Sequence, residues 1–396
     1  MSERTKGLGT ENAFEVLGEV KELMRQGKDI VSFCIGQPDF VTPDNIRDAG
    51  IKAIKEGKTD YTPSQGMIEL RNAIAEFESK RTGVEYDAGE VVVDAGAKPF
   101  IGYTVLSVTD FGKGHEVIYP RPGYPIYESQ IVAHGCKPVQ LNLLEEKAFS
   151  FDVEELKEKV NKNTRLLIIN SPQNPTGGIL SKADLKAIAD LAEEFDFWIF
   201  SDEIYTKIIY EKKVPSIVSI EGMKERTILS SGVSKTYSMT GWRIGYALNK
   251  PLIKHLTRWV TNTTSCAAHM SQYAAMEALK GPQEEAEKMR KSFQERRDLI
   301  VKGLNDIEGI HCLSPGGTFY VYPNTTEACK LVGAKNAEEF RKRLLNDAGV
   351  AVLADIHFGA KNPSEGEHSR LSFATSKENI KEGLGRIKEY IEKNKK

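Results

Sequence analysis

The chain has 396 residues, of which 40% are hydrophobic and 28% charged, so its length predicts two domains that share an interface rather than one small core. Its net charge of −2 and the lack of a basic block argue against a nucleic-acid partner, and the polar N-terminal stretch has no apolar leader. Five scattered cysteines without a CxxC pair, and no apolar run long enough to span a membrane, predict a soluble cytoplasmic protein with reduced thiols and no metal site.

The N-terminal part of the chain predicts helices around one short strand. Apolar residues recur at helical spacing over Glu11–Gln26, and a strand then runs from Ile30 into the turn Gly36-Gln37-Pro38-Asp39. Two further helices are expected over Pro43–Glu56 and Gly66–Lys80. The linker between them contains Tyr61.

Between Glu90 and Leu248, short apolar runs are separated by loops and helical patterns. The expected strands are Val91–Val93, Glu116–Tyr119, Lys137–Leu141, Arg165–Asn170, Trp198–Phe200, Thr227–Leu229 and Ile244–Leu248. The expected helices are Pro99–Val108 and Ser181–Phe195, the second with a capping box of Ser181 and Asp184. This pattern predicts an α/β domain whose mostly parallel sheet is covered by helices on both faces.

Beyond Gly281-Pro282 the pattern changes to a smaller α+β domain. A long charged helix, Gln283 to about Gly303, leads into it. The expected strands are Ile310–Leu313, Phe319–Tyr322, Val350–Leu353 and Arg370–Phe373, and the expected helices are Ala337–Ala348 and Lys377–Lys393. We expect a large domain over residues 45–285 and a small domain built from residues 1–44 together with 286–396.

Candidate site residues follow several of the predicted strands of the large sheet. They are Gly96, Ala97, Lys98, Tyr124, Asn174, Asp202, Tyr205 and Lys235. Ligands of parallel sheets bind at the carboxyl ends of the strands, so we expect these residues to converge on one crevice.

Lys235 lies in a loop of small and hydroxyl residues, with Arg243 eight positions later. A lysine amine attacks a carbonyl group only after burial or a neighbouring cation lowers its pKa. Arg243 could supply that cation. The alternative is a polar loop with a solvated lysine, but the convergence of the other loops favours a nucleophile.

The pattern Gly232-x-Ser234-Lys235, followed by Gly241-x-Arg243-Ile244-Gly245, resembles the lysine signature of the class I and II aminotransferases. These enzymes have the aspartate aminotransferase fold, known as fold type I, and use pyridoxal 5′-phosphate (PLP). The resemblance extends from Gly36 to Arg370, and it implies a PLP-dependent aminotransferase with Lys235 as the residue that holds the cofactor.

The resemblance also implies roles for the other residues. Asp202 would keep the pyridine nitrogen of the cofactor protonated, although a carboxylate here could also only cap a turn. Asn174 and Tyr205 would donate to the phenolic oxygen of the ring, and Tyr124 would stack on it. We expect Lys235, Asp202 and Tyr205 to be the catalytic residues.

The cofactor phosphate would lie on the turn Gly96-Ala97-Lys98, since a helix N-terminus attracts anions. Arg243 would grip the same phosphate, and Tyr61 would reach it from the other subunit of a homodimer. The chain has Gly232 where some family members have a phosphate-binding serine, so that contact stays open between Ser231 and Ser234.

The substrate would contact Gly36, Tyr124, Asn174 and Arg370, with Arg370 gripping its α-carboxylate as a bidentate fork. The implied reaction moves an amino group from an L-amino acid, either aspartate or a broad or aromatic donor, to a 2-oxo acid such as 2-oxoglutarate. An aspartate-specific enzyme needs a further cation, and the sequence leaves Lys98 and Arg121 open for it. A β-eliminating lyase of the same fold is one alternative, and a non-catalytic ligand-sensing module is another.

Overall fold

The computed structural model describes residues 2, 5, 8–9, 12–211, 213–361 and 365–396. Its largest element is an eight-stranded sheet with the strand order β2-β9-β8-β7-β6-β3-β4-β5. The strands are β2 (Val91–Asp94), β3 (Glu116–Arg121), β4 (Lys137–Leu144), β5 (Ser150–Phe151), β6 (Thr164–Asn170), β7 (Trp198–Asp202), β8 (Thr227–Gly232) and β9 (Gly245–Leu248).

The large sheet is mixed, with a parallel majority. Strands β4, β3, β6, β7 and β8 pair in parallel, whereas β9 runs antiparallel between β2 and β8, and β5 runs antiparallel to β4. The loop that joins the antiparallel strands β8 and β9 carries Lys235, the lysine that the sequence predicts to be the nucleophile.

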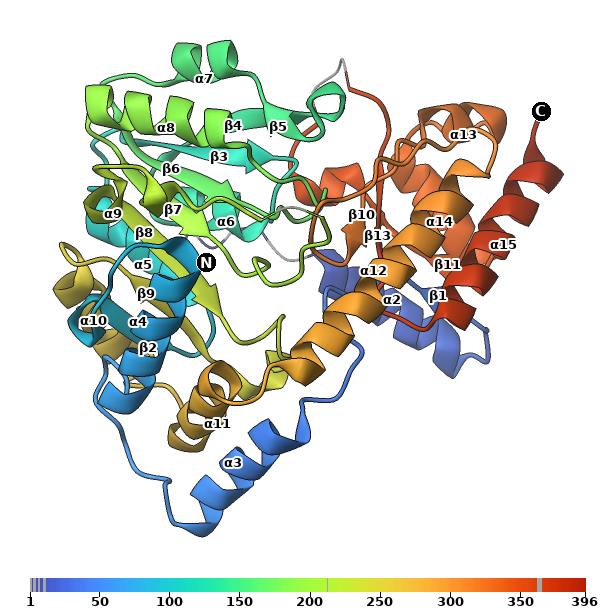
Figure 1. The fold of residues 1–396 in the computed structure, drawn as a ribbon. Coiled ribbons are helices and arrows are strands. Elements are labelled where there is room, and N and C mark those ends of the chain that lie inside the picture. The colour runs from blue at the N-terminus through green and yellow to red at the C-terminus, as the bar shows by residue number, and fades with distance from the viewer. Residues whose placement is uncertain (1, 3–4, 6–7, 10–11, 212, 362–364) are drawn as a thin grey trace.

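Helices pack against the eight-stranded sheet and also form much of the remaining chain (Figure 1). They are α2 (Asn12–Arg25), α3 (Asp44–Lys55), α4 (Ile68–Thr82), α5 (Pro99–Val108), α6 (Ile126–Ala133), α7 (Val153–Lys159), α8 (Lys182–Phe195), α9 (Met223–Arg226), α10 (Ile253–Thr263), α11 (His269–Lys280), α12 (Glu284–Asn305), α13 (Thr326–Leu331), α14 (Ala337–Asp347) and α15 (Lys377–Asn394). The predicted capping box of α8 is confirmed, because Ser181 and Asp184 exchange side-chain-to-backbone hydrogen bonds. No helix in the described ranges combines the length and the apolar character needed to cross a bilayer.

The alternation of side chains along β6 explains why helices lie on both faces of the sheet. Leu167 and Ile169 pack in the same apolar cluster as Leu185 of α8. Leu166 and Ile168 point the other way and pack in the cluster that contains Phe100 of α5. An apolar strand of this kind is stable only when both faces are covered.

Two smaller sheets lie beside this one. Strand β1 (Val31–Ser32) pairs in parallel with β11 (Val350–Ala351), and β13 (Ser369–Ser372) lies between β10 (Tyr320–Val321) and β12 (Leu353–Ala354). Helix α12 runs from the region of α11 to the region of α14 (Figure 1). The division into residues 45–285 and residues 1–44 with 286–396 stays a prediction, which the pairing of β1 with β11 supports.

Several predicted elements have different bounds. The strand expected over Ile310–Leu313 is wrong, because in this described stretch Cys312 exchanges hydrogen bonds with the Asn305 side chain at 2.9 and 3.0 Å, and only His311 forms a bridge. The strand expected over Val350–Leu353 is divided between two sheets. The helix expected from Glu11 begins at Asn12, and Glu11 itself lies outside the described residues.

Candidate active site

A cavity of about 450 Å³ lies between the carboxyl ends of the large sheet and the segments that contain Gly36, Phe358 and Arg370. Most of the predicted site residues line it. They are Gly36, Ala97, Lys98, Tyr124, Asn174, Asp202, Tyr205, Lys235, Arg243 and Arg370. The predicted convergence of the loops is therefore correct.

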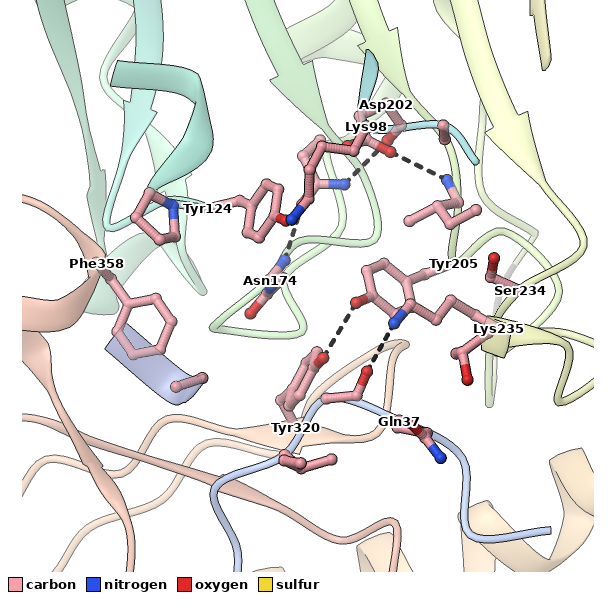
Figure 2. Close-up of a pocket in the computed structure, with 18 of the residues that line it drawn as sticks. Gln37, Lys98, Tyr124, Asn174, Asp202, Tyr205, Ser234, Lys235, Tyr320 and Phe358 are labelled. Atoms are coloured by element: carbon pink, nitrogen blue, oxygen red, sulfur yellow. Dashed lines mark hydrogen bonds between the residues drawn. The ribbon is translucent and has the colours of Figure 1, made fainter. Parts of the chain in front are cut away.

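The loop between β8 and β9 points Lys235 into this cavity (Figure 2). Its Nζ donates a hydrogen bond of 2.6 Å to the carbonyl oxygen of Gly36. A side chain at Gly36 would overlap the hydroxyl of Tyr320, so only glycine fits this position.

A second set of contacts ties the lysine loop to the segment after Gly36. Thr42 Oγ1 donates to the Ser238 carbonyl oxygen at 2.6 Å, and Trp242 Nε1 donates to Thr42 Oγ1 at 3.1 Å. Ser238 Oγ in turn donates to the carbonyl oxygen of Phe40. These bonds join the lysine loop to the segment that follows Gly36.

Asp202 is the last residue of β7 and is held from two sides. Tyr127 OH donates to Oδ2 at 2.7 Å, and the Ile204 backbone N–H donates to Oδ1 at 3.3 Å. Burial raises the pKa of Asp202 to about 6, although the Tyr127 hydrogen bond acts in the opposite direction. A buried carboxylate of this kind is stabilised by a cationic partner.

Tyr127 is a site residue that sequence reasoning missed. It is fully buried on α6, and its ring packs edge-on against Tyr124 with centroids 5.6 Å apart. It therefore contacts both Asp202 and the ring predicted to stack on the cofactor. Its spacing of three residues from Tyr124 on a helical turn is the signal that could have identified it.

Tyr205 and Tyr320 meet across the cavity (Figure 2), with their hydroxyl oxygens 3.1 Å apart. Burial raises the pKa of Tyr205 well above its ordinary value, so the phenol stays protonated and can donate. Tyr320 belongs to β10, in another sheet, and no local sequence pattern predicted it.

The turn Gly96-Ala97-Lys98, predicted to bind the cofactor phosphate, lies directly before α5. Gly96 has a positive φ of +94°, and α5 begins at Pro99. Arg243 donates to the carbonyl oxygens of Ala95 and Thr240 at 3.0 and 2.8 Å, which places its guanidinium beside the turn. A side chain at Gly96 would overlap this guanidinium, and a side chain at Gly245 would overlap the backbone of Ala97.

The two candidate serines differ in their surroundings. Ser234 lines the cavity beside Lys235 (Figure 2). Ser231 instead donates to the backbone carbonyl oxygen of Glu203 at 3.2 Å. The geometry favours Ser234 for an anion in the cavity.

Arg370 approaches the cavity from β13 and is 3% exposed. It donates to Asn174 Oδ1 at 3.3 Å and to the Cys34 carbonyl oxygen. Its Nε is buried and has no hydrogen-bond partner among the described residues. A carboxylate would satisfy this guanidinium as a bidentate partner.

Three predicted residues lie elsewhere. Gly96 does not line the cavity itself, although it contacts Arg243. Tyr61 lies on the linker between α3 and α4 and is 89% exposed, which suits a contact with another subunit. Arg121 is 3% exposed and pairs with Glu365, so it does not face the cavity.

Comparisons with known proteins agree with this geometry. The family model described as aminotransferase class I and II matches residues 28–387. The aspartate aminotransferase of Bacillus subtilis is 39% identical over 396 residues, which cover 99% of each chain. The asparagine–oxo-acid transaminase of Streptococcus mutans is 39% identical over 377 residues, or 94% of each chain. The crystal structure of the aspartate aminotransferase from Rhizobium meliloti superposes with a TM-score of 0.92 at 33% identity, covering 99% of this chain and 98% of that one.

Proposed function

This chain belongs to the class I and II aminotransferase family, and from that premise we propose that it moves the amino group of L-aspartate to a 2-oxo acid such as 2-oxoglutarate. One observation carries the proposal: Lys235, Asp202 and Arg370 line a single cavity at the carboxyl ends of the large sheet. The amine, the carboxylate and the guanidinium are the three charged groups that amino transfer requires.

The family implies PLP, and the residues of the cavity fit this cofactor. Asp202 is a buried carboxylate that suits a cationic ring nitrogen, and the turn before α5 with Arg243 suits a phosphate. Tyr124, Asn174 and Tyr205 would hold the ring from the remaining sides. When bound, PLP supplies an electron-accepting ring and carries the amino group from one substrate to the other.

The protein's own groups then have defined tasks. Lys235 Nζ takes the proton from the α-carbon of the amino acid, and the same amine returns a proton to the α-carbon formed from the 2-oxo acid. Arg370 holds the α-carboxylate of both substrates. Asn174 accepts from Arg370 through Oδ1, so its NH₂ group remains the donor toward the cofactor ring.

Lys98 is the residue we propose to recognise the distal carboxylate of aspartate. The cations that line the cavity are Lys98, Lys235, Arg243 and Arg370, and the last three already have tasks. The Lys98 ammonium lies 5.7 Å from the centroid of the Tyr124 ring. Lys98→Met should lower kcat/KM for aspartate by about tenfold or more, the loss of one charge-assisted hydrogen bond, and change that for alanine much less.

A second candidate donor is asparagine, which the related transaminase of Streptococcus mutans is named for. An amide accepts a hydrogen bond from an ammonium group as a carboxylate does, but it lacks the charge. The ratio of kcat/KM for aspartate and asparagine therefore decides between the two.

We propose a homodimer with shared active sites, and its support is Tyr61. This side chain is 89% exposed, and the exposed apolar residues Ile51, Ile54 and Ile68 lie on the helices beside it. An apolar surface of this kind is typical of a subunit interface. The five free cysteines, four of them buried, support the expected cytoplasmic location.

The first test is an absorbance spectrum of the purified protein with PLP, before and after L-aspartate is added. We expect a band that requires Lys235 and is absent from Lys235→Ala, and aspartate should shift it to shorter wavelength as the amino group is transferred. No Lys235-dependent band would refute the cofactor assignment. Release of ammonia and pyruvate without a 2-oxo acid would indicate a β-eliminating lyase instead.

A further inference from the structure

A cluster of side chains away from the cavity joins the strand of Arg370 to the large sheet. Glu145 begins the short helix η2 (Glu145–Lys147), directly after β4. Its Oε2 accepts a hydrogen bond of 2.9 Å from Asn324 Nδ2 and lies 3.1 Å from His368 Nε2. Asn324 and His368 form a backbone bridge with each other beside the three-stranded sheet. One carboxylate thus links the edge of the large sheet to the segment that leads into β13.

Both nitrogens of the His368 ring have a partner. Nε2 faces the Glu145 carboxylate, and Nδ1 lies 3.1 Å from the carbonyl oxygen of Gly366. Burial would raise the pKa of Glu145, but the bonds from His368 and Asn324 hold it below its ordinary value. The ring is therefore held from two sides, with an ionised carboxylate on one of them.

Aromatic rings from both sides enclose the His368 ring. The Tyr322 ring stacks on it with centroids 4.9 Å apart, and the Phe149 ring lies edge-on at 6.2 Å. Phe149 follows η2 closely in the chain, so the large sheet supplies both an ionic and an apolar contact to His368.

The remaining titratable groups near the ring come from the elements packed around it. They are Asp355, Lys361, Glu367, His311 and Tyr322. Asp355 accepts the backbone N–H of His368 at 3.3 Å, and Lys361 pairs with Asp355 and Glu367.

His368 is connected to Arg370 through the strand and through packed rings. The two residues are separated by one residue, so their side chains lie on the same side of the strand. The Tyr322 ring contacts Phe358 edge-on at 6.1 Å, and the Arg370 guanidinium lies 5.0 Å from the centroid of Phe358. Figure 2 shows Phe358 at the cavity. A displacement of His368 would therefore move the groups that hold a substrate carboxylate.

We propose that His368, held between Glu145 and Gly366, is a positioning residue that aligns Arg370 for the α-carboxylate of both substrates. This inference rests on the proposed role of Arg370. It predicts that the affinity for carboxylic substrates depends on a contact outside the cavity, which we name the Glu145–His368 clasp.

The test compares Glu145→Gln with Glu146→Gln, which removes the same charge from the exposed neighbouring residue. Glu145→Gln should raise KM for both the amino donor and the 2-oxo acid by roughly three- to tenfold. This is the effect of weakening a hydrogen bond to a charged group when only part of the loss reaches Arg370. Values of kcat and the affinity for PLP should stay close to those of the wild type. Glu146→Gln should change none of these quantities.

Two outcomes would overturn the proposal: unchanged KM values in Glu145→Gln, or an equal effect of Glu146→Gln. A loss of thermal stability without a change in KM would show a structural role only. If the wild type itself does not transfer amino groups, the proposed function fails instead, so the two failures are distinguishable. Asn324→Ala removes the other donor to Glu145 and should raise KM in the same direction.

Discussion

At the scale of single residues, Asp202 has the most unusual environment in the cavity. Its folded-state pKa is about 6, whereas an aspartate in an unfolded chain has a pKa of about 3.9. Between these values the folded protein binds more protons than the unfolded chain. The free energy of unfolding therefore falls as the pH rises through this window, and it stays lower above pH 6. Without a cationic partner, the buried carboxylate of Asp202 therefore lowers the stability of the fold.

The matching prediction concerns Asp202→Asn without cofactor. The substitution removes this titration. The free energy of unfolding of the variant minus that of the wild type should therefore be about 2 kcal/mol larger at pH 8 than at pH 4.5. Urea denaturation at both pH values measures this change, and Asp48→Asn, at an exposed position, serves as the control. Equal pH dependence in variant and wild type would contradict it. PLP should bind Asp202→Asn much more weakly.

At the scale of elements, the close approach of β9 to the turn before α5 brings together the groups that we propose to bind the cofactor phosphate. Gly245 begins β9, and its Cα faces the backbone of Gly96 and Ala97 without room for a side chain. Arg243 precedes it by two residues and has a positive φ of +56°, which turns its guanidinium toward the same turn. Position 245 thus requires glycine because β9 and the turn before α5 are in contact there.

We therefore expect Gly245→Ala to displace the turn Gly96–Lys98. The substitution should lower the PLP affinity by more than about tenfold and destabilise the fold by about 1–3 kcal/mol, the usual cost of overpacking. A PLP titration and a denaturation curve measure the two effects. Gly385→Ala on α15, where a Cβ meets no atom within 4 Å, is the control. Unchanged PLP affinity in Gly245→Ala would disprove the structural explanation.

At the scale of the whole molecule, the proposed dimer makes each active site depend on two chains. Tyr61→Phe should weaken PLP binding by about tenfold, since a hydrogen bond to a charged phosphate is lost. Its exposed position makes an effect on the fold of one chain small.

Mixing the Tyr61→Phe and Lys235→Ala proteins tests this arrangement directly. At limiting PLP both homodimers should be nearly inactive. A mixed dimer contains one site with Lys235 from one chain and Tyr61 from the other, so activity should appear after subunit exchange. If Tyr61 acts within its own chain, mixing restores nothing.

The sequence by itself determined the parts of this protein that depend on local patterns. Apolar runs defined most strands of the large sheet, the capping box of α8 was readable from Ser181 and Asp184, and the rule for strand ends brought Lys235 and Asp202 to one crevice. The lysine signature, present in the sequence, identified the family. These features follow from the periodicity of side chains and from backbone rules that act over a few residues.

Only the tertiary structure decided the rest. The partnership of Tyr205 with Tyr320, the split of Val350–Leu353 between two sheets, and the clasp between Glu145 and His368 all join residues that are distant in the chain. No local pattern encodes such contacts, because they depend on how two packed sheets meet. The structure also distinguished Lys98, which lines the cavity, from Arg121, which is buried and paired with Glu365. Both are ordinary cations in the sequence, and only their positions in the fold differ.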